Sequence, residues 1–401
     1  MNWFLSSTVR HACAMRSHVQ KILNHQRDIL APKAVSEVES AMREMKNAVA
    51  SNADKAALQK QMEKLEQTAG KWLKPYPNAA WRENVEVLLV ALAVAMGIRT
   101  FFLQPFKIPT GSMQPTLFGV KSKNQINQPD FKIPGVARRL ADWVHGISYV
   151  HLVAKNDGEL EDVTRPWPPA IFSLFEGVKI GGSWQIIWLP PDFGEQPLQN
   201  RANLEKGRFY HKGDEVVKLE VHAGDHLFVD RVTYNFSPPE RGQIVVFETH
   251  GITRLPPDQQ DTFYIKRLVG LGGETLSIHQ DYQMLGVPQF GTVPVGNLVV
   301  DGRPLSASTP HFENLYSFSG ASPRAGDLQY KEDQYYGHAM IWGLAPGNEF
   351  QVETNHYFVM GDKTMNSSDS RYWGDFPQRQ VIGKSFFVYW PITSRFGWGN
   401  R

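Results

Sequence analysis

The stretch VEVLLVALAVAMGIRTFFLQPFKIPTGSMQPTLFG, residues 85–119, decides how the chain is organised. Its first part contains an uninterrupted apolar run over 87–98, with Glu86 and Arg99 near the two ends. The run is shorter than the ~20 apolar residues that a membrane span needs, but long charged side chains at the ends can snorkel to the membrane surface. We therefore predict a transmembrane helix over 85–103, with a buried core helix as the alternative.

The second part of the stretch leaves the apolar run and presents a serine at once. Ser112 lies in a turn that Pro109 and Pro115 stiffen on both sides, and Gly111 lets the backbone turn closely there. Two apolar side chains nearby, Phe106 and Met113, suit either the edge of a bilayer or simple core packing.

The charges before the apolar run predict its orientation. Residues 1–84 contain 13 Lys or Arg, so the positive-inside rule places them in the cytoplasm and residues 104–401 outside. This predicts a single-pass protein of the inner (cytoplasmic) membrane. The first 27 residues have no Asp or Glu but carry arginines and serines, which is also typical of an organellar transit peptide. An organellar inner membrane is therefore the alternative.

Residues 1–84 have the pattern of polar, amphipathic helices. Apolar side chains recur at three- and four-residue steps from Val35 to Val49 and again from Leu58 to Leu65. Ser51 with Asp54 is a plausible cap for the second of these helices. We predict a two-helix hairpin with an apolar seam, and a surface for a partner helix is the alternative.

After residue 104 the chain consists of short β-type runs separated by Gly, Pro and Asp. The β-branched and aromatic content of these runs predicts a mostly β catalytic body. The runs are HLFVDRVTY (226–234), GQIVVFET (242–249), TFYIKRLVGL (262–271), NLVVDGRPL (297–305), HYFVMGD (356–362) and KSFFVYWP (384–391).

Composition excludes several classes of protein. The formal charge of +2 gives no reason to expect a nucleic-acid partner. Cys13 is the only cysteine, so the chain has neither an intramolecular disulfide nor a Cys-based metal site.

A serine becomes a nucleophile only when a base removes its proton, and the usual bases are His, Lys or an N-terminal amine. None of the 13 histidines lies in a recognisable nucleophile motif, and GxSxG is absent around Ser112. Lys266 lies among apolar residues, on the face of a predicted strand that Tyr264 and Leu268 share, whereas Arg267 points the other way. Pattern alone leaves Lys266 as either a snorkelling edge residue or a base with a depressed pKa.

Five motifs resemble those of the type I signal peptidases, the leader peptidases of the Ser/Lys class in family S26. In chain order they are PTGSMQPTL (109–117), GDHLFVDR (224–231), RGQIVVFE (241–248), YIKRLVGLGGETL (264–276) and GDKTMNSSDSRYWG (361–374). The resemblance implies a signal-peptidase-like β body with large insertions, placed after the helical hairpin and the transmembrane helix.

The resemblance also implies a role for individual residues. Ser112 matches the nucleophile and Lys266 the general base, while the backbone N–H of Ser112 and the hydroxyl of Thr110 match the oxyanion hole. Ser367 matches a serine that orients the lysine, and Asp369 and Arg371 match a supporting pair. The family uses no metal and no organic cofactor, so we expect neither here.

The implied function is a membrane-bound serine endopeptidase that removes N-terminal signal peptides from exported preproteins, cleaving after small residues in an Ala-X-Ala pattern. Its expected partners are these preproteins and the lipid bilayer, and not nucleic acid. The alternatives are a catalytically inactive homologue that binds signal peptides, a self-cleaving repressor-type protease and a purely structural membrane anchor.

The sequence departs from the family pattern in several places. We predict insertions over about 121–220 and 306–350 within the extracytoplasmic catalytic domain, 104–401. The first is expected to be a folded, β-rich elaboration, which either faces the substrate or the membrane or is a peripheral embellishment. In the last motif Lys363-Thr364-Met365 replaces the usual Asn-Arg-Asp, which puts the contacts of the replaced residues in doubt. At the C-terminus we expect a strand followed by an interfacial tail.

Overall fold

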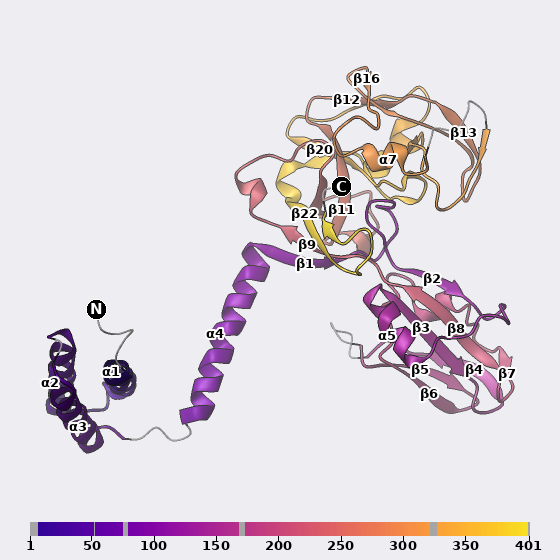
Figure 1. Ribbon diagram of the computed structural model, residues 1–401. Coiled ribbons are helices and arrows are strands. Elements are labelled where there is room, and N and C mark those ends of the chain that lie inside the picture. The colour runs from indigo at the N-terminus through magenta and orange to yellow at the C-terminus, as the bar shows by residue number, and fades with distance from the viewer. Residues whose placement is uncertain (1–6, 52, 75–78, 168–172, 321–326, 400–401) are drawn as a thin grey trace. The chain divides into compact units, whose positions relative to one another are not determined.

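The computed structural model of the protein describes residues 7–51, 53–74, 79–167, 173–320 and 327–399 (Figure 1). The chain divides into two compact units, Met1–Val94 and Ala95–Arg401. The first predicted insertion contains residues 168–172 and the second contains 321–326, so these parts of the two predictions lie outside the described residues.

The first unit contains three packed helices, α1 (Ser7–Gln26), α2 (Pro32–Ala50) and α3 (Lys55–Trp72). The predicted hairpin corresponds to α2 and α3, and α1 adds Val19 and Leu23 to their common core. Asp54 caps α3 by accepting a hydrogen bond of 2.7 Å from the N–H of Ala57, whereas Ser51 ends α2.

Helix α4 (Ala79–Phe101) starts six residues before the predicted membrane segment, 85–103, and ends two residues short of its predicted end. Its part Trp81–Phe101 is long and apolar enough to cross a membrane, and none of its most apolar window is buried against the protein. Strand β1 begins at Leu103, so only Phe102 separates the end of the helix from the main sheet.

The second unit is built on an eight-stranded sheet, in the order β1-β9-β22-β10-β11-β20-β21, with β23 paired to β22. All pairs in this sheet are antiparallel. The strands are β1 (Leu103–Lys107), β9 (His226–Asp230), β10 (Ile244–Glu248), β11 (Phe263–Leu271), β20 (His356–Met360), β21 (Phe376–Pro377), β22 (Val381–Trp390) and β23 (Gly397–Trp398).

Both faces of the central strands are buried, which explains why their sequences read as continuous apolar runs. In β10, Val245 and Phe247 pack into one core, and Ile244 and Val246 pack into another on the opposite face. The predicted strands, and with them the mostly β fold class, are confirmed.

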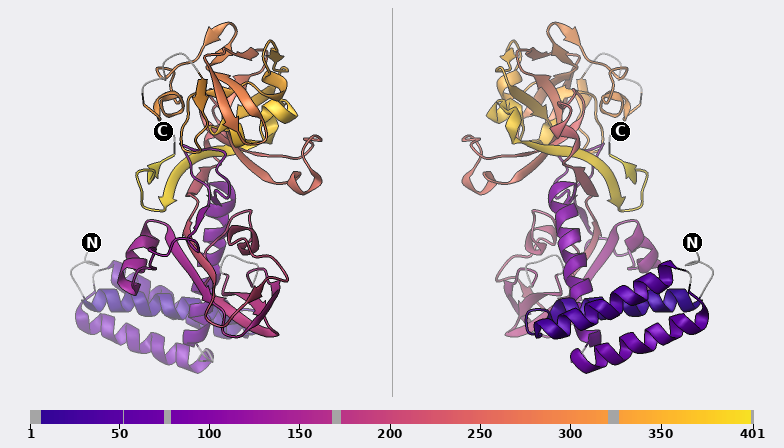
Figure 2. Two further views of the ribbon diagram at one scale, coloured as in Figure 1. Left: turned by 90° about the vertical axis from the view of Figure 1, so that its right-hand side faces the viewer. Right: turned by 90° about the vertical axis from the view of Figure 1, so that its left-hand side faces the viewer.

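Residues 121–222 form a separate β-rich module with a core of its own, as predicted for the first insertion. One sheet has the order β2-β8-β3 and the other the order β6-β5-β4-β7. The elements are β2 (Lys121–Asn124), α5 (Val136–Val144), β3 (Ile147–Val153), β4 (Gly158–Val163), β5 (Phe175–Ile180), β6 (Ser183–Trp188), α6 (Leu198–Arg201), β7 (Phe209–Tyr210) and β8 (Glu215–His222). Figure 2 shows β22 as a long, curved strand whose C-terminal end reaches toward α5.

Two further four-stranded sheets follow β11, in the orders β16-β15-β12-β19 and β17-β13-β14-β18. Their strands are β12 (Thr275–Ile278), β13 (Tyr282–Val287), β14 (Gly291–Gly296), β15 (Leu298–Val300), β16 (Arg303–Pro304), β17 (Asp327–Gln329), β18 (His338–Ala339) and β19 (Phe350–Gln351). The short helices of the second unit outside the module are η1 (Thr233–Asn235), η2 (Pro257–Gln259), α7 (Glu313–Ser317), η3 (Trp342–Leu344), η4 (Thr364–Asn366), α8 (Ser370–Trp373) and η5 (Gln378–Gln380).

Candidate active site

The fold brings Ser112 and Lys266 together although 154 positions separate them in sequence. Ser112 lies in the loop after β1, and Lys266 lies in β11, which is held between β10 and β20 in the sheet. The Lys266 Nζ lies 2.6 Å from the Ser112 Oγ. Only 7% of Ser112 and 5% of Lys266 is exposed. Lys266 is therefore an interior residue, and the alternative of a snorkelling lysine on an edge strand is wrong.

The surroundings of Lys266 favour its neutral form. Burial lowers the pKa of the amine from 10.5 to about 8, although the charges of Asp369 and Glu195 act in the opposite direction. The Tyr264 ring lies on the same side of the strand, with its centroid 5.6 Å from the Nζ. A neutral amine at hydrogen-bond distance from a hydroxyl can take up its proton.

The loop around Ser112 is fixed by backbone contacts. The N–H of Lys363 donates a 3.0 Å hydrogen bond to the carbonyl of Ser112, which ties the loop to the last motif. The Thr110 Oγ1 lies 3.5 Å from the Ser112 Oγ, so the structure brings the predicted oxyanion hydroxyl next to the nucleophile. Tight packing occurs at Gly119, where a Cβ would lie 2.1 Å from the Thr110 carbonyl, whereas a Cβ on Gly111 would only press against the Gln114 side chain.

The two apolar side chains near Ser112 belong to the core of the second unit. Met113 is fully buried and Phe106 packs against the same cluster, which includes Ile108 and Leu117. For these two residues core packing, rather than contact with a bilayer edge, is therefore the better interpretation.

Asp369 and Arg371 form a buried ion pair, and both charges act on the pKa of Lys266. Asp369 accepts hydrogen bonds from the Arg371 Nε at 2.9 Å and from the N–H of Gly361 at 3.0 Å. Burial raises the pKa of Asp369, but the Arg371 guanidinium outweighs this effect and the pKa is lowered overall. Asp369 is therefore ionised, and its negative charge acts on the pKa of Lys266 more strongly than the positive charge of Arg371 does.

Ser367 is buried in the same region, but it does not hydrogen-bond to Lys266 in this structure. Its Oγ has no hydrogen-bond partner among the residues that the structure describes. It faces Gly361, where a Cβ would lie 2.2 Å from that Oγ and 2.6 Å from the Ser112 carbonyl. The glycine thus allows Ser367 to lie beside the nucleophile loop.

Sequence reasoning missed a second buried ion pair on the other face of β11. Arg267 donates hydrogen bonds of 2.7 and 2.6 Å to the two oxygens of Asp362, and the Thr116 hydroxyl also reaches this carboxylate. Both charged side chains are almost fully buried. Since Asp362 adjoins Lys363, this pair anchors the segment that holds the Ser112 carbonyl. The adjacent Lys-Arg in the lysine motif was a signal, because an arginine on a buried strand needs a partner.

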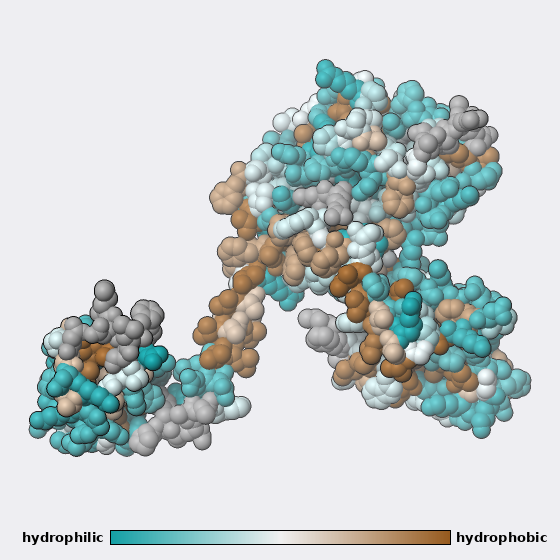
Figure 3. Space-filling view, in the orientation of Figure 1, coloured by the Kyte–Doolittle hydropathy of each residue, from teal (hydrophilic) through white to brown (hydrophobic). Residues whose placement is uncertain are grey.

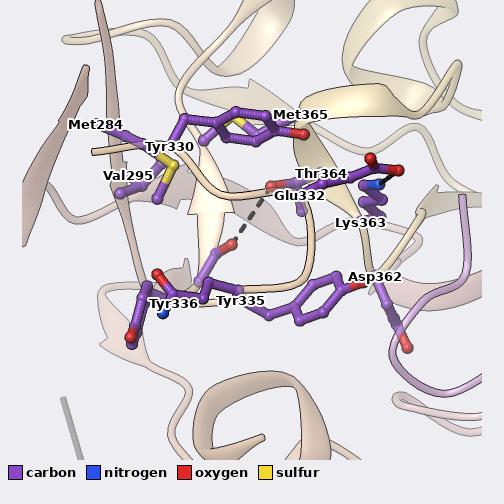
Figure 4. A pocket seen from close by; sticks show the side chains of 12 residues that line it. Met284, Val295, Tyr330, Glu332, Tyr335, Tyr336, Asp362, Lys363, Thr364 and Met365 are labelled. Atoms are coloured by element: carbon purple, nitrogen blue, oxygen red, sulfur yellow. Dashed lines mark hydrogen bonds and ion pairs between the residues drawn. The ribbon is translucent and has the colours of Figure 1, made fainter. Parts of the chain in front are cut away.

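The replaced residues of the last motif make new contacts with the second predicted insertion. The Lys363 Nζ lies 3.2 Å from a Glu332 oxygen, and Thr364 accepts a 3.0 Å hydrogen bond from the N–H of Ala339. Figure 4 shows Glu332 beside Lys363 and the ring of Tyr335 pointing toward Asp362. The cavity between these side chains is about 20 Å³, enough for one water but not for a larger ligand.

The first inserted module also reaches the active-site loop. Asp192 forms an ion pair of 2.6 Å with Lys107 of β1, and a Cβ on Gly194 would lie 2.8 Å from the Pro109 carbonyl. Next to them, the charge of Glu195 raises the pKa of Lys266. The module is therefore attached beside the nucleophile rather than peripheral to it. The acidic loop PDFGEQP (191–197) was its only sequence signal.

Metal ligands are not grouped at this site. Among the described residues no set of three His, Cys, Asp or Glu side chains is placed to hold an ion. The arrangement instead provides a nucleophile, a base, a hydroxyl donor and buried charges, which are the components of acyl transfer.

Comparison with known proteins gives a consistent result. A family model described as "Signal peptidase, peptidase S26" matches residues 81–125 and 215–390, which is more than half of the chain. The signal peptidase I of Leptolyngbya laminosa is 27% identical over 227 residues, which cover 56% of this chain and 84% of that protein. The signal peptidase I of Aquifex aeolicus is 29% identical over 193 residues, which cover 42% of this chain and 70% of that protein.

A solved structure of a signal peptidase I from Enterococcus faecalis is 22% identical and covers 37% of this chain and 97% of that chain. Its TM-score of 0.22 is too low to support an argument about the fold. The family match includes every predicted site residue, and it leaves residues 126–214 of the inserted module unmatched.

Proposed function

Because the chain belongs to the peptidase S26 family of signal peptidases, we propose that it is a membrane-bound serine endopeptidase that removes N-terminal signal peptides from exported preproteins. The observation that carries the proposal is the 2.6 Å approach of the Lys266 Nζ to the Ser112 Oγ inside the protein. The family membership supplies the substrate class, and the geometry supports the assignment of Ser112 as nucleophile and Lys266 as base.

In the proposed mechanism, neutral Lys266 takes the Ser112 proton as the Oγ attacks the scissile carbonyl carbon. The resulting oxyanion would be held by the N–H of Ser112 and the Thr110 hydroxyl. When the C–N bond breaks, protonated Lys266 gives its proton to the leaving amine, and the signal peptide remains as an ester on Ser112. Water, activated by Lys266 that is neutral again, then hydrolyses this ester.

We assign supporting roles to the residues around the dyad. Ser367 would orient Lys266 once substrate is bound, because its free hydroxyl already lies beside the nucleophile loop. Asp369 and Arg371 would hold the segment that carries it. We propose cleavage after small residues, in an Ala-X-Ala pattern, from the family membership alone.

We further propose the domain arrangement that the charge pattern predicts. Residues 1–84 would lie in the cytoplasm, α4 would cross the inner membrane, and residues 104–401 would form the catalytic domain outside. The length and exposure of α4 support this arrangement. The near-neutral charge of the chain supports a role without nucleic acid.

Cleavage of a preprotein by purified protein in detergent tests the proposal, with wild type compared with Ser112→Ala and Lys266→Ala. We expect wild type to cut after a small residue and both variants to lose detectable cleavage, because one lacks the nucleophile and the other the base. If wild type binds the preprotein without cutting it, the inactive homologue is the better assignment. Normal cleavage by either variant would refute the dyad.

A further inference from the structure

Helix α5 of the inserted module buries a single residue, which is polar, and leaves its apolar side chains exposed. Asp142 is 5% exposed, and it accepts a 3.0 Å hydrogen bond from the Tyr149 hydroxyl. On another side of the helix, Val136, Leu140 and Trp143 recur at four- and three-residue steps and are exposed to solvent, with 65% of Leu140 and 58% of Trp143 exposed. A helix of a soluble domain normally buries its apolar side. In α5 the apolar side faces solvent instead (Figure 3). We call these three residues the apolar stripe.

Polar contacts fix α5 in this orientation. The Ile392 N–H donates a 3.1 Å hydrogen bond to the Val144 carbonyl, and the His145 Nδ1 lies 2.7 Å from the Ile392 carbonyl. Pro391 closes over the end of the helix, where a Cβ on Gly146 would lie 2.7 Å from the proline. The helix therefore cannot turn to bury its stripe without breaking these contacts, and the exposed stripe is a fixed feature of the fold.

The register of the main sheet places the stripe near the end of α4. The Trp143 and Trp390 rings are in contact, with centroids 5.9 Å apart. Trp390 of β22 pairs with His226 of β9, and His226 pairs with Lys107 of β1. From Trp390 to Lys107 the distance across the sheet is two strand spacings, and from Lys107 to Leu103 the distance along β1 is four residues. Because these two directions are perpendicular, Trp390 lies roughly 16 Å from the start of β1. The exposed stripe thus begins within a short distance of the point where the apolar helix ends.

The chemistry of the stripe matches the interface of a bilayer. Tryptophan is enriched where lipid headgroups meet acyl chains, and the stripe presents Trp143 next to Trp390. Arg139 is exposed and flanks the stripe on the same helix, where a guanidinium can reach lipid phosphates. A short helix with this division of side chains can lie in the plane of the interface.

We propose that the apolar stripe of α5 lies in the headgroup region of the same bilayer that α4 spans, so that the inserted module rests on the membrane beside the active site. The inference builds on the proposed function, since it needs α4 to be in the membrane. It assigns a role to a segment that the family match does not cover. The module would hold the Ser112 loop, through the Lys107–Asp192 pair, at a set height above the lipid.

Spin labelling of the full chain in vesicles of phosphatidylethanolamine and phosphatidylglycerol tests this inference. Cys13→Ser removes the single native thiol, and a nitroxide is then attached at Leu140→Cys or, as a matched control at an exposed position outside the stripe, at Ala141→Cys. Relaxation of the label by oxygen, which partitions into lipid, is compared with relaxation by a water-soluble nickel chelate. We expect oxygen to dominate at residue 140 and the nickel chelate to dominate at residue 141.

A third label at Leu92→Cys in α4 separates this inference from the proposed function. A lipid signal at residue 92 with an aqueous signal at residue 140 overturns the docking of the module and leaves the membrane span in place; a protein partner would then be the occupant of the stripe. Aqueous signals at both positions overturn the span and the docking together. Lipid signals at both, with an aqueous signal at residue 141, support the inference.

Discussion

The catalytic sheet and the inserted module follow opposite rules of burial. The sheet buries its charges: the Arg267–Asp362 and Asp369–Arg371 pairs are enclosed around the dyad. Outside its own core, the module leaves apolar side chains exposed on α5 and along β6, where Trp188 is 70% exposed. Each departure from ordinary burial coincides with a proposed function, chemistry in the first region and contact with lipid in the second.

The largest expected effect comes from breaking a buried charge pair in the catalytic sheet. Asp362→Ala leaves Arg267 charged, buried and without its partner, and we expect it to destabilise the protein by about 3–5 kcal/mol. Denaturant unfolding of the purified protein measures this loss. Replacing both partners, as Arg267→Met with Asp362→Leu, should restore much of the stability, because no unpaired charge remains.

An exposed pair in the module serves as the control. Lys206→Ala breaks an ion pair with Asp162 of similar length, 2.7 Å, between two exposed side chains, and it should change stability by less than about 1 kcal/mol. Equal losses from the buried and the exposed pair would contradict the comparison.

The next largest effect is the loss of stability when an apolar side chain is removed from the core of the module, compared with removal of one from its outer surface. Leu160→Ala opens a cavity in the module's core and should cost about 2–5 kcal/mol. Trp188→Ala removes a larger side chain, but that side chain is exposed, so the change should stay within about 0.5 kcal/mol. The same unfolding measurement compares the two variants. A large loss from Trp188→Ala would mean that the exposed row of β6 is part of the folded core.

The smallest effect tests whether the module influences the chemistry. Glu195→Gln removes a carboxylate whose charge raises the pKa of Lys266, so the pKa should fall and activity should persist to slightly lower pH. The dependence of kcat/KM on pH measures the shift. As the control, Glu205→Gln removes a negative charge at another exposed position of the module, and it should not shift the dependence of kcat/KM on pH. An unchanged profile for Glu195→Gln would show that the module acts on the site by packing alone.

The sequence was sufficient to predict the strands and to propose the pairing of Ser112 with Lys266, for different reasons. The strand runs are local patterns, so composition and spacing were enough. The pairing of Ser112 with Lys266 is not local, and only the resemblance to a family with a known dyad connected them. From the pattern, Lys266 could still be an edge residue, and its position in β11 between two strands settles that question.

Other features depend on contacts that local patterns do not specify. The apolar positions of α5 are spaced as in any amphipathic helix, and only the buried Asp142 shows that the helix is turned outward. The contact of the module with the Ser112 loop depends on Asp192 and Gly194, which lie 80 or more residues from the nucleophile. The replaced Lys363 and Thr364 acquire partners from the second predicted insertion, which the motif alone did not indicate.

The pH dependence of wild-type kcat/KM tests the central claim most directly, because Lys266 must be neutral to act as the base. Protonation below its pKa of about 8 removes the base, so we predict an acid limb with a midpoint near pH 8 and a fall of about tenfold per pH unit below it. The measurement uses a substrate without groups that titrate in this range. A rate that stays flat from pH 8 down to the acidic range would contradict a buried, neutral Lys266 as the base for Ser112.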